Sequence, residues 1–148
     1  MSNKEHSFQI ELRKTGPMEF TTKFDKDFPN LLFDEPLTSG GNDKYPNASR
    51  IFTASIANCL SASLTFCLSK TRIEIPDLNV VTKATCYISR NEDGYIRIKK
   101  INVEIFPSSS NYSKELIMAL ERCKDRFANY CVVSQSVKAG VNIEFVIK

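Results

Sequence analysis

Five cysteines are the residues of this sequence with the most chemistry to offer, because a thiolate is both a nucleophile and a redox centre. A thiolate can be oxidised to a sulfenic acid, which a second thiol converts to a disulfide. The default role of a single cysteine is nevertheless a small buried hydrophobe, and spacing alone raises none of the five above it. They are Cys59, Cys67, Cys86, Cys123 and Cys131.

Other catalytic and metal-binding arrangements are poorly supported by the residues present. The single histidine, His6, lies near the N-terminus, which argues against a Ser-His or Cys-His triad. Gly40-Gly41 is weak evidence for a phosphate loop, since no Gly-rich segment follows a strand and opens a helix. Two pairs of cysteines are spaced eight residues apart, and about 12 Å of helical rise is too far for a shared zinc ion. We therefore expect neither a metal nor a cofactor.

The composition is that of one ordinary globular domain, which we expect to span residues 1–148. Hydrophobic residues make up 42% and charged residues 25% of the chain. The 20 basic and 17 acidic side chains are spread along the sequence, which argues against a dedicated nucleic-acid-binding face. The first seven residues are polar and unlike a secretory signal, so we expect a cytoplasmic protein whose cysteines are kept reduced.

The elements that must position the cysteines begin with short strands. Alternating apolar residues from Phe8 to Leu12, and again from Phe20 to Phe24, predict a β-hairpin around Gly16-Pro17. An extended piece over residues 31–33 follows the hairpin. A loop with turn residues then leads to a segment of different character.

An uncharged stretch from Ile51 to Ser69 predicts a long helix at the centre of the fold. Seven of its 19 residues are Ser, Thr or Asn, which argues against a membrane span and for a helix buried on most sides. Cys59 lies in the middle of this helix, too deep for the helix N-terminus to lower its pKa. Cys67 lies about 80° around the helix from Cys59, and we expect it to be in the core.

Two strands follow the central helix. Alternating apolar residues predict strands over residues 78–88, which include Cys86, and over residues 96–105. Asn91–Gly94 has the composition of a hairpin turn. The apolar phase changes at Lys99-Lys100, which predicts a β-bulge.

The last part of the chain predicts two helices and a strand. Apolar residues at steps of three and four predict an amphipathic helix over residues 112–129, with Cys123 on its apolar face. Cys131 opens a short helical stretch over residues 132–138, and a strand over residues 141–147 ends the chain. The predicted order is βββ-α-ββ-α-α-β, which is an α+β fold.

Several segments resemble the OsmC/Ohr family, whose names stand for osmotically inducible protein C and organic hydroperoxide resistance. The resemblance covers about residues 5–148 and implies an OsmC-like fold, with a long central buried helix packed against sheets in an intertwined homodimer. The family has one cysteine on the central helix and a second in a Cys-x-x-Ser setting, which correspond here to Cys59 and Cys131. The resembling segments are Asp34-Glu35-Pro36, Gly40-Gly41, residues 54–64 and residues 129–137.

The resemblance implies a thiol-dependent peroxidase that reduces organic hydroperoxides to alcohols. Cys59 would attack the peroxide and become a sulfenic acid, and Cys131 would then close a Cys59–Cys131 disulfide, which an external dithiol reduces. Cys67, Cys86 and Cys123 would stay reduced. Position along the helices favours the opposite assignment, because Cys131 lies at the start of a short helix and has the better local case for a thiolate.

One position departs from the family pattern. Family peroxidases pair an N-terminal arginine with a glutamate ten residues before the first cysteine, and that position here is Ser49. We expect Arg13 to supply the cation that activates Cys59, with Lys14 and Lys23 as substitutes. A non-peroxidatic protein of the same fold, which binds a hydrophobic ligand or partner, is the alternative.

Overall fold

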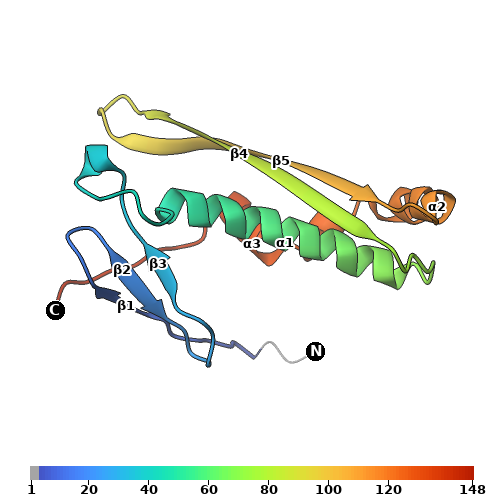
Figure 1. Ribbon diagram of the computed structural model, residues 1–148, viewed down its shortest axis with the longest axis horizontal. Helices are drawn as coiled ribbons and strands as arrows, with labels where there is room; N and C mark the ends of the chain where they lie inside the picture. The colour runs from blue at the N-terminus through green and yellow to red at the C-terminus, as the bar shows by residue number, and fades with distance from the viewer. Residues whose placement is uncertain (1–3) are drawn as a thin grey trace. The chain divides into compact units, whose positions relative to one another are not determined.

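The chain, described over residues 4–148 by a computed structural model, forms two compact units (Figure 1). The N-terminal unit ends at Ile51, and the C-terminal unit spans Phe52–Lys148. Within the described residues, three α-helices and two small antiparallel sheets make this an α+β protein, as the sequence patterns predict. The order of three strands, a long helix, two strands and two helices agrees with the prediction as far as residue 139.

The N-terminal unit is built on a three-stranded antiparallel sheet whose strands are neighbours in chain order. The predicted hairpin is confirmed, with Leu12 opposite Thr22. Its first strand begins three residues later than Phe8, whose side chain is exposed and has no strand to pack against. The elements of this unit are β1 (Glu11–Lys14), β2 (Phe20–Lys23), β3 (Leu31–Phe33) and the short 3₁₀ helix η1 (Leu37–Ser39).

A buried carboxylate organises the loop after β3. Asp34 accepts hydrogen bonds from the backbone amides of Glu35, Asn42 and Lys44 at 2.8, 3.1 and 3.2 Å. Burial raises the pKa of Asp34, but these amides lower it by more, so its pKa lies below the ordinary value. Gly41 fits so closely that a Cβ would lie 1.8 Å from the Glu35 carbonyl oxygen. The acidic motif and the glycine pair therefore have a structural role in closing this loop.

The C-terminal unit combines a long helix with a two-stranded ribbon and two shorter helices. Figure 1 shows the ribbon lying along the helix, and a 2.6 Å hydrogen bond between the hydroxyls of Ser61 and Thr82 joins them. The first turn of the long helix belongs to the N-terminal unit. The elements are α1 (Ala48–Lys70), β4 (Asn79–Arg90), β5 (Ile96–Ser108), α2 (Ser113–Cys123), the 3₁₀ helix η2 (Phe127–Tyr130) and α3 (Val132–Ala139).

The β4–β5 ribbon contains the predicted bulge. Tyr87 pairs with Lys100, whereas the next residue, Ile88, pairs with Ile98, so Lys99 is the extra residue. Such an extra residue shifts the alternation of side chains between the two faces of a strand. The predicted phase change at this point is therefore confirmed.

The helix α1 is only partly covered by the rest of the described chain. By length and composition this helix could cross a membrane, but one helix of this kind is weak evidence for a membrane span. The predicted central helix is confirmed, and most of its residues between Ile51 and Leu68 are buried or half-buried, although one face carries exposed residues such as Ala54, Asn58 and Ala62. Between Ile51 and Ser69 no charged side chain lies on this face, so it interacts poorly with water, and the described part of one chain leaves it open.

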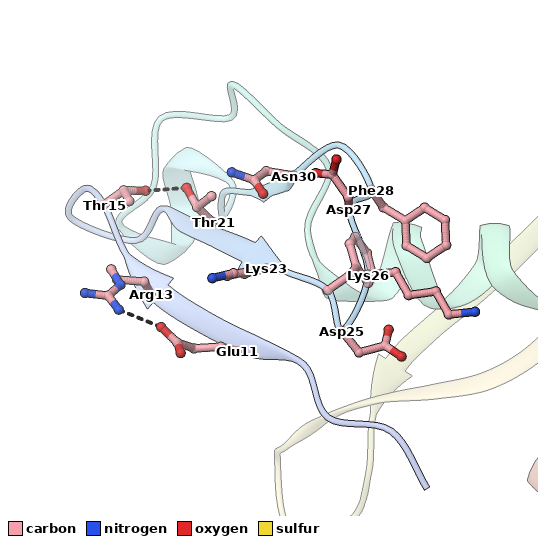
Figure 2. Close-up of a pocket in the computed structure, with 11 residues that line it drawn as sticks. Glu11, Arg13, Thr15, Thr21, Lys23, Asp25, Lys26, Asp27, Phe28 and Asn30 are labelled. Atoms are coloured by element: carbon pink, nitrogen blue, oxygen red, sulfur yellow. Dashed lines mark hydrogen bonds and ion pairs between the residues drawn. The ribbon is translucent and has the colours of Figure 1, made fainter. Parts of the chain in front are cut away.

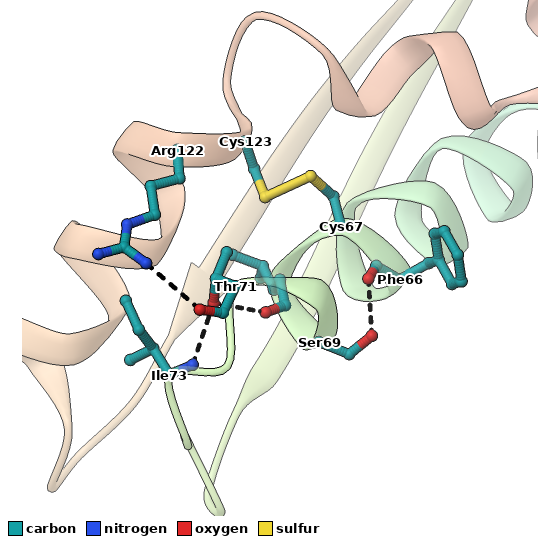
Figure 3. Close-up of a disulfide and its surroundings, with 8 residues drawn as sticks. Phe66, Cys67, Ser69, Thr71, Ile73, Arg122 and Cys123 are labelled. Atoms are coloured by element: carbon teal, nitrogen blue, oxygen red, sulfur yellow. Dashed lines mark hydrogen bonds between the residues drawn. A yellow bond between two sulfur atoms is a disulfide. The ribbon is translucent and has the colours of Figure 1, made fainter.

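The core of the C-terminal unit lies where α1 meets α2. Leu64 and Leu68 of α1 pack with Leu116 of α2. Cys67 and Cys123 lie in this core, as predicted, but they are joined by a disulfide (Figure 3). The prediction that both stay reduced is therefore wrong. The apolar faces of the two helices bring the two Cα atoms within 5.9 Å, inside the range that a disulfide spans.

The end of the chain differs from the prediction in two places. The helix α2 stops at Cys123 instead of continuing to Asn129, and η2 follows it. Residues 141–148 form no strand, because they pair with no strand of the described chain. Apolar side chains of this segment are consequently exposed, with Phe145 at 91% and Ile147 at 95%.

Candidate active site

Cys131 occupies the N-cap position of α3. Its backbone is extended, with φ −80° and ψ 98°, and its sulfur accepts a hydrogen bond from the Ser134 amide at 3.3 Å. The sulfur thus takes the place of the oxygen that a Ser, Thr, Asp or Asn cap provides. Because the first amides of a helix point toward its cap, this position favours a negative charge on Cys131.

The helix α1 brings Cys59 to the same point. The Cys59 thiol is in hydrogen-bond contact with the sulfur of Cys131, and the amides of Val132 and Val133 also reach Cys59. Cys131 is fully buried, whereas Cys59 is half-buried. Two residues 72 positions apart in the sequence therefore form one thiol pair, with Cys59 as the more accessible sulfur.

The two thiols differ in acidity. Burial raises the pKa of the Cys59 thiol, and the neighbouring Cys131 raises it further, although the amides of Val133 and Val132 lower it in part. Burial also raises the pKa of Cys131, but hydrogen bonds from Ser134 and from the Cys59 thiol outweigh it, so the pKa of Cys131 lies below its ordinary value. The position of Cys131 at the start of a short helix had predicted that its pKa is the lower of the two.

Ser134 supports the Cys131 sulfur with two groups. Its amide donates to Cys131, and its hydroxyl is buried with no hydrogen-bond partner among the described residues. A free hydroxyl can turn its proton toward a thiolate, which agrees with its effect in lowering the pKa of Cys131. The Cys-x-x-Ser spacing could have predicted this contact, because an N-cap side chain commonly accepts a hydrogen bond from the amide of the third residue after it.

Arg13 belongs to the N-terminal unit. It lies on β1 and forms an ion pair with Glu11, with Nη2 and Oε1 2.6 Å apart and both side chains exposed. Figure 2 shows this pair and Lys23 at the wall of a cavity of about 660 Å³. Arg13 and the thiol pair belong to different units. The role of Arg13 as the activating cation therefore stays a prediction.

The position of the expected glutamate is occupied by a capping network. The Ser49 hydroxyl and the Arg50 guanidinium both donate to the Asn47 side-chain oxygen, at 3.0 and 3.3 Å. The Arg50 amide donates to the same oxygen at 3.2 Å. Ser49 therefore takes part in forming the start of α1.

Two adjacent sulfurs, one acidic and one accessible, can undergo a reversible two-electron oxidation to a disulfide. Among residues 4–148, no three His, Cys, Asp or Glu side chains are grouped so that they could hold a metal ion. The remaining thiol, Cys86, is half-buried on β4. The candidate site is thus the Cys59–Cys131 thiol pair with Ser134 beside it.

A model of the OsmC-like protein family matches residues 41–146, most of the chain and both cysteines of the pair. The chain therefore belongs to the OsmC-like family. A search of curated protein sequences found no match.

Solved structures are similar to this chain in fold. An OsmC-like protein of unknown function from Vibrio cholerae has a TM-score of 0.74 at 15% identity, with 90% of this chain and 95% of that chain covered. An organic hydroperoxide resistance protein from Elizabethkingia anophelis has 0.61 at 19%, covering 97% and 94%. The organic hydroperoxide resistance protein OhrB of Bacillus subtilis has 0.56 at 16%, covering 94% and 96%. At these identities the likeness establishes the fold.

Proposed function

We propose that this OsmC-like protein reduces organic hydroperoxides to alcohols, with Cys59 and Cys131 as its redox pair. The main support is the contact between the two sulfurs at the N-terminus of α3. A thiolate and a thiol in contact can together deliver two electrons and close as a disulfide. The similar folds of the hydroperoxide resistance proteins from E. anophelis and B. subtilis support the choice of substrate.

The first step uses the different properties of the two sulfurs. When the pair carries one negative charge, that charge favours Cys131 and the proton stays on Cys59, because the pKa of Cys131 is lowered and that of Cys59 is raised. Transfer of this proton to Cys131 makes the more accessible Cys59 sulfur the nucleophile. The Cys59 thiolate attacks the terminal peroxide oxygen, an S–O bond forms and the O–O bond breaks. The departing alkoxide takes the proton from Cys131 and leaves as the alcohol.

The second step closes the disulfide. The Cys131 thiolate attacks the sulfur of the Cys59 sulfenic acid, an S–S bond forms, and hydroxide leaves and becomes water with a solvent proton. An external dithiol then restores both thiols by thiol–disulfide exchange. One hydroperoxide and two thiol groups thus give one alcohol, one water and one disulfide.

We further propose a location from the sequence, and an assembly and an activating cation from membership of the family. The protein acts in the reducing cytoplasm, where a dithiol reductant is available. It is an intertwined homodimer. Arg13 stabilises the Cys59 thiolate during the attack, a task that neither the middle of α1 nor the Cys131 sulfur can perform.

A coupled turnover assay tests the proposed reaction. The reduced protein is mixed with tert-butyl hydroperoxide, cumene hydroperoxide or hydrogen peroxide, and consumption is followed with a dithiol as reductant. We expect the organic peroxides to be consumed faster than hydrogen peroxide. The Cys86→Ser variant is the matched control and should retain activity. Absence of turnover with all three peroxides would favour the alternative, a binding protein with the same fold.

A further inference from the structure

A cavity of about 510 Å³ lies beside the thiol pair, within the range of small-ligand pockets. One side is a single face of α1, made by Phe52, Ile56 and Leu60 at intervals of four residues. Ser134 of α3 also lines the cavity. Because the Ser134 amide also contacts the Cys131 sulfur, the cavity and the thiol pair share a wall.

The bulge in β5 brings lysines into this cavity. In a regular strand alternate residues face opposite sides, but residues 98–101 all line the cavity around the extra residue Lys99. Lys99 and Lys100 therefore stand beside the apolar Ile98 and Ile101. The third lysine, Lys138, lies one helical turn after Ser134 on α3.

The cavity is positively charged and apolar at once. All three lysines are exposed, and the described residues that line the cavity include no carboxylate. No Asp or Glu of residues 4–148 forms an ion pair with any of the three. Lys100 lies over the Tyr87 ring, 5.4 Å from its centroid, a contact that leaves its positive charge uncompensated.

We propose that this cavity binds an anionic amphiphile, with an alkyl chain on the α1 face and its acidic head group between Lys99, Lys100 and Lys138. Ammonium groups attract a carboxylate or a phosphate, and the apolar wall gains from covering methylene groups. This site stands apart from the proposed peroxidase reaction, because its ligand needs no peroxide group. If the ligand does carry a peroxide, the shared wall would place it next to the thiols.

Binding of unreactive amphiphiles to the reduced wild-type protein tests the proposal. Decanoate and decyl phosphate are compared with decanol and decylammonium by titration calorimetry. We expect both anions to bind at least tenfold more tightly than decanol, and decylammonium not to bind. Affinity should rise about threefold to fourfold per methylene from octanoate to dodecanoate. A preference between decanoate and decyl phosphate would identify the head group.

Replacement of the three lysines distinguishes the contribution of charge to binding from that of the apolar wall. The variant K99Q/K100Q/K138Q should lose at least tenfold in decanoate affinity while decanol binding stays unchanged. Lys114→Gln, at an exposed position on α2, is the matched control and should bind decanoate normally. Circular dichroism checks that both variants fold.

Two outcomes would overturn the proposal. One is equal binding of decanoate by the wild type and the triple lysine variant. The other is no binding of decanoate by the folded wild type, as expected if a second copy of the chain covers the cavity. Peroxide turnover can succeed or fail in either case, so failure of this site is distinguishable from failure of the peroxidase proposal.

Discussion

At the scale of single residues, acidity and access are divided between the two sulfurs of the pair. Cys131 has the lower pKa because the start of α3 and Ser134 stabilise its thiolate. Cys59 is easier to reach but has a raised pKa. A peroxidase needs both properties in one sulfur at the moment of attack, so the proton between Cys59 and Cys131 must be able to move.

Removal of the Ser134 hydroxyl should make Cys131 less acidic. In Ser134→Ala the thiolate loses one hydrogen-bond donor, so we expect the pKa of Cys131 to rise. As pH rises, the thiolate of the variant should therefore appear at higher pH than that of the wild type. The ultraviolet absorbance of thiolate, recorded against pH in a Cys86→Ser background, measures the shift. Ser136→Ala, at an exposed position of α3, should leave the curve in place.

Replacement of Arg13 by methionine tests the cation assigned to Cys59. If Arg13 stabilises the Cys59 thiolate, its loss should raise the pKa of Cys59 and slow its alkylation at neutral pH about tenfold. Peptide mapping after brief treatment with iodoacetamide gives the rate for each cysteine. Lys14→Met is the neighbouring control. A slower rate in Lys14→Met, with Arg13→Met unchanged, would transfer the role to Lys14.

At the scale of elements, the Cys67–Cys123 disulfide ties the C-terminal part of α1 to the end of α2. Figure 3 shows it beside a second link, in which the Arg122 guanidinium donates to the Thr71 carbonyl oxygen. The two cysteines are fully buried and lie apart from the thiol pair. This disulfide therefore has a structural role, with no part in the proposed reaction.

Removal of this disulfide should lower the stability of the fold. It closes a loop between residues 56 positions apart, and for a loop of this length the chain-entropy estimate is about 4 kcal/mol. Cys67→Ala/Cys123→Ala should lower the free energy of unfolding in urea by roughly that amount, while peroxide turnover persists. Cys86→Ala is the control, with a small expected change. A double variant as stable as the wild type would mean that the two cysteines are reduced in solution.

Local patterns predicted most of the elements but not how they meet. The bulge at Lys99 and the helix that begins after Cys131 could be predicted, because phase and spacing within one element reveal them. The pairing of Cys67 with Cys123 could not be predicted, since it depends on how the faces of two helices meet. The thiol pair of Cys59 with Cys131 came from the family resemblance, for the same reason.

At the scale of the whole molecule, two surfaces of the described chain lack a partner. One is the uncharged face of α1, and the other is the apolar segment of residues 141–148. A strand was expected over residues 141–147, and its alternating pattern is present, but pairing requires a neighbour that this chain does not provide. Pattern alone cannot tell a strand that pairs within a chain from one that pairs between chains. Both surfaces agree with the proposed homodimer.

The proposed homodimer should make stability depend on protein concentration. If the chain folds only as a dimer, its thermal unfolding midpoint should rise with concentration, because association and folding are coupled. Analytical ultracentrifugation at micromolar concentration should give twice the mass of the chain. Deletion of residues 141–148 should lower the midpoint. A folded monomer whose midpoint does not vary with concentration would contradict this prediction.

The most direct test of the central claim is to identify the disulfide that a peroxide creates. The reduced protein receives one equivalent of cumene hydroperoxide, free thiols are blocked, and the linked peptides are mapped by mass spectrometry. We expect a new Cys59–Cys131 link, a Cys59 sulfenic acid in Cys131→Ser, and no peroxide consumption in Cys59→Ser. Loss of activity in Cys131→Ser alone would reverse the two roles. Consumption of peroxide that needs neither cysteine would contradict the claim.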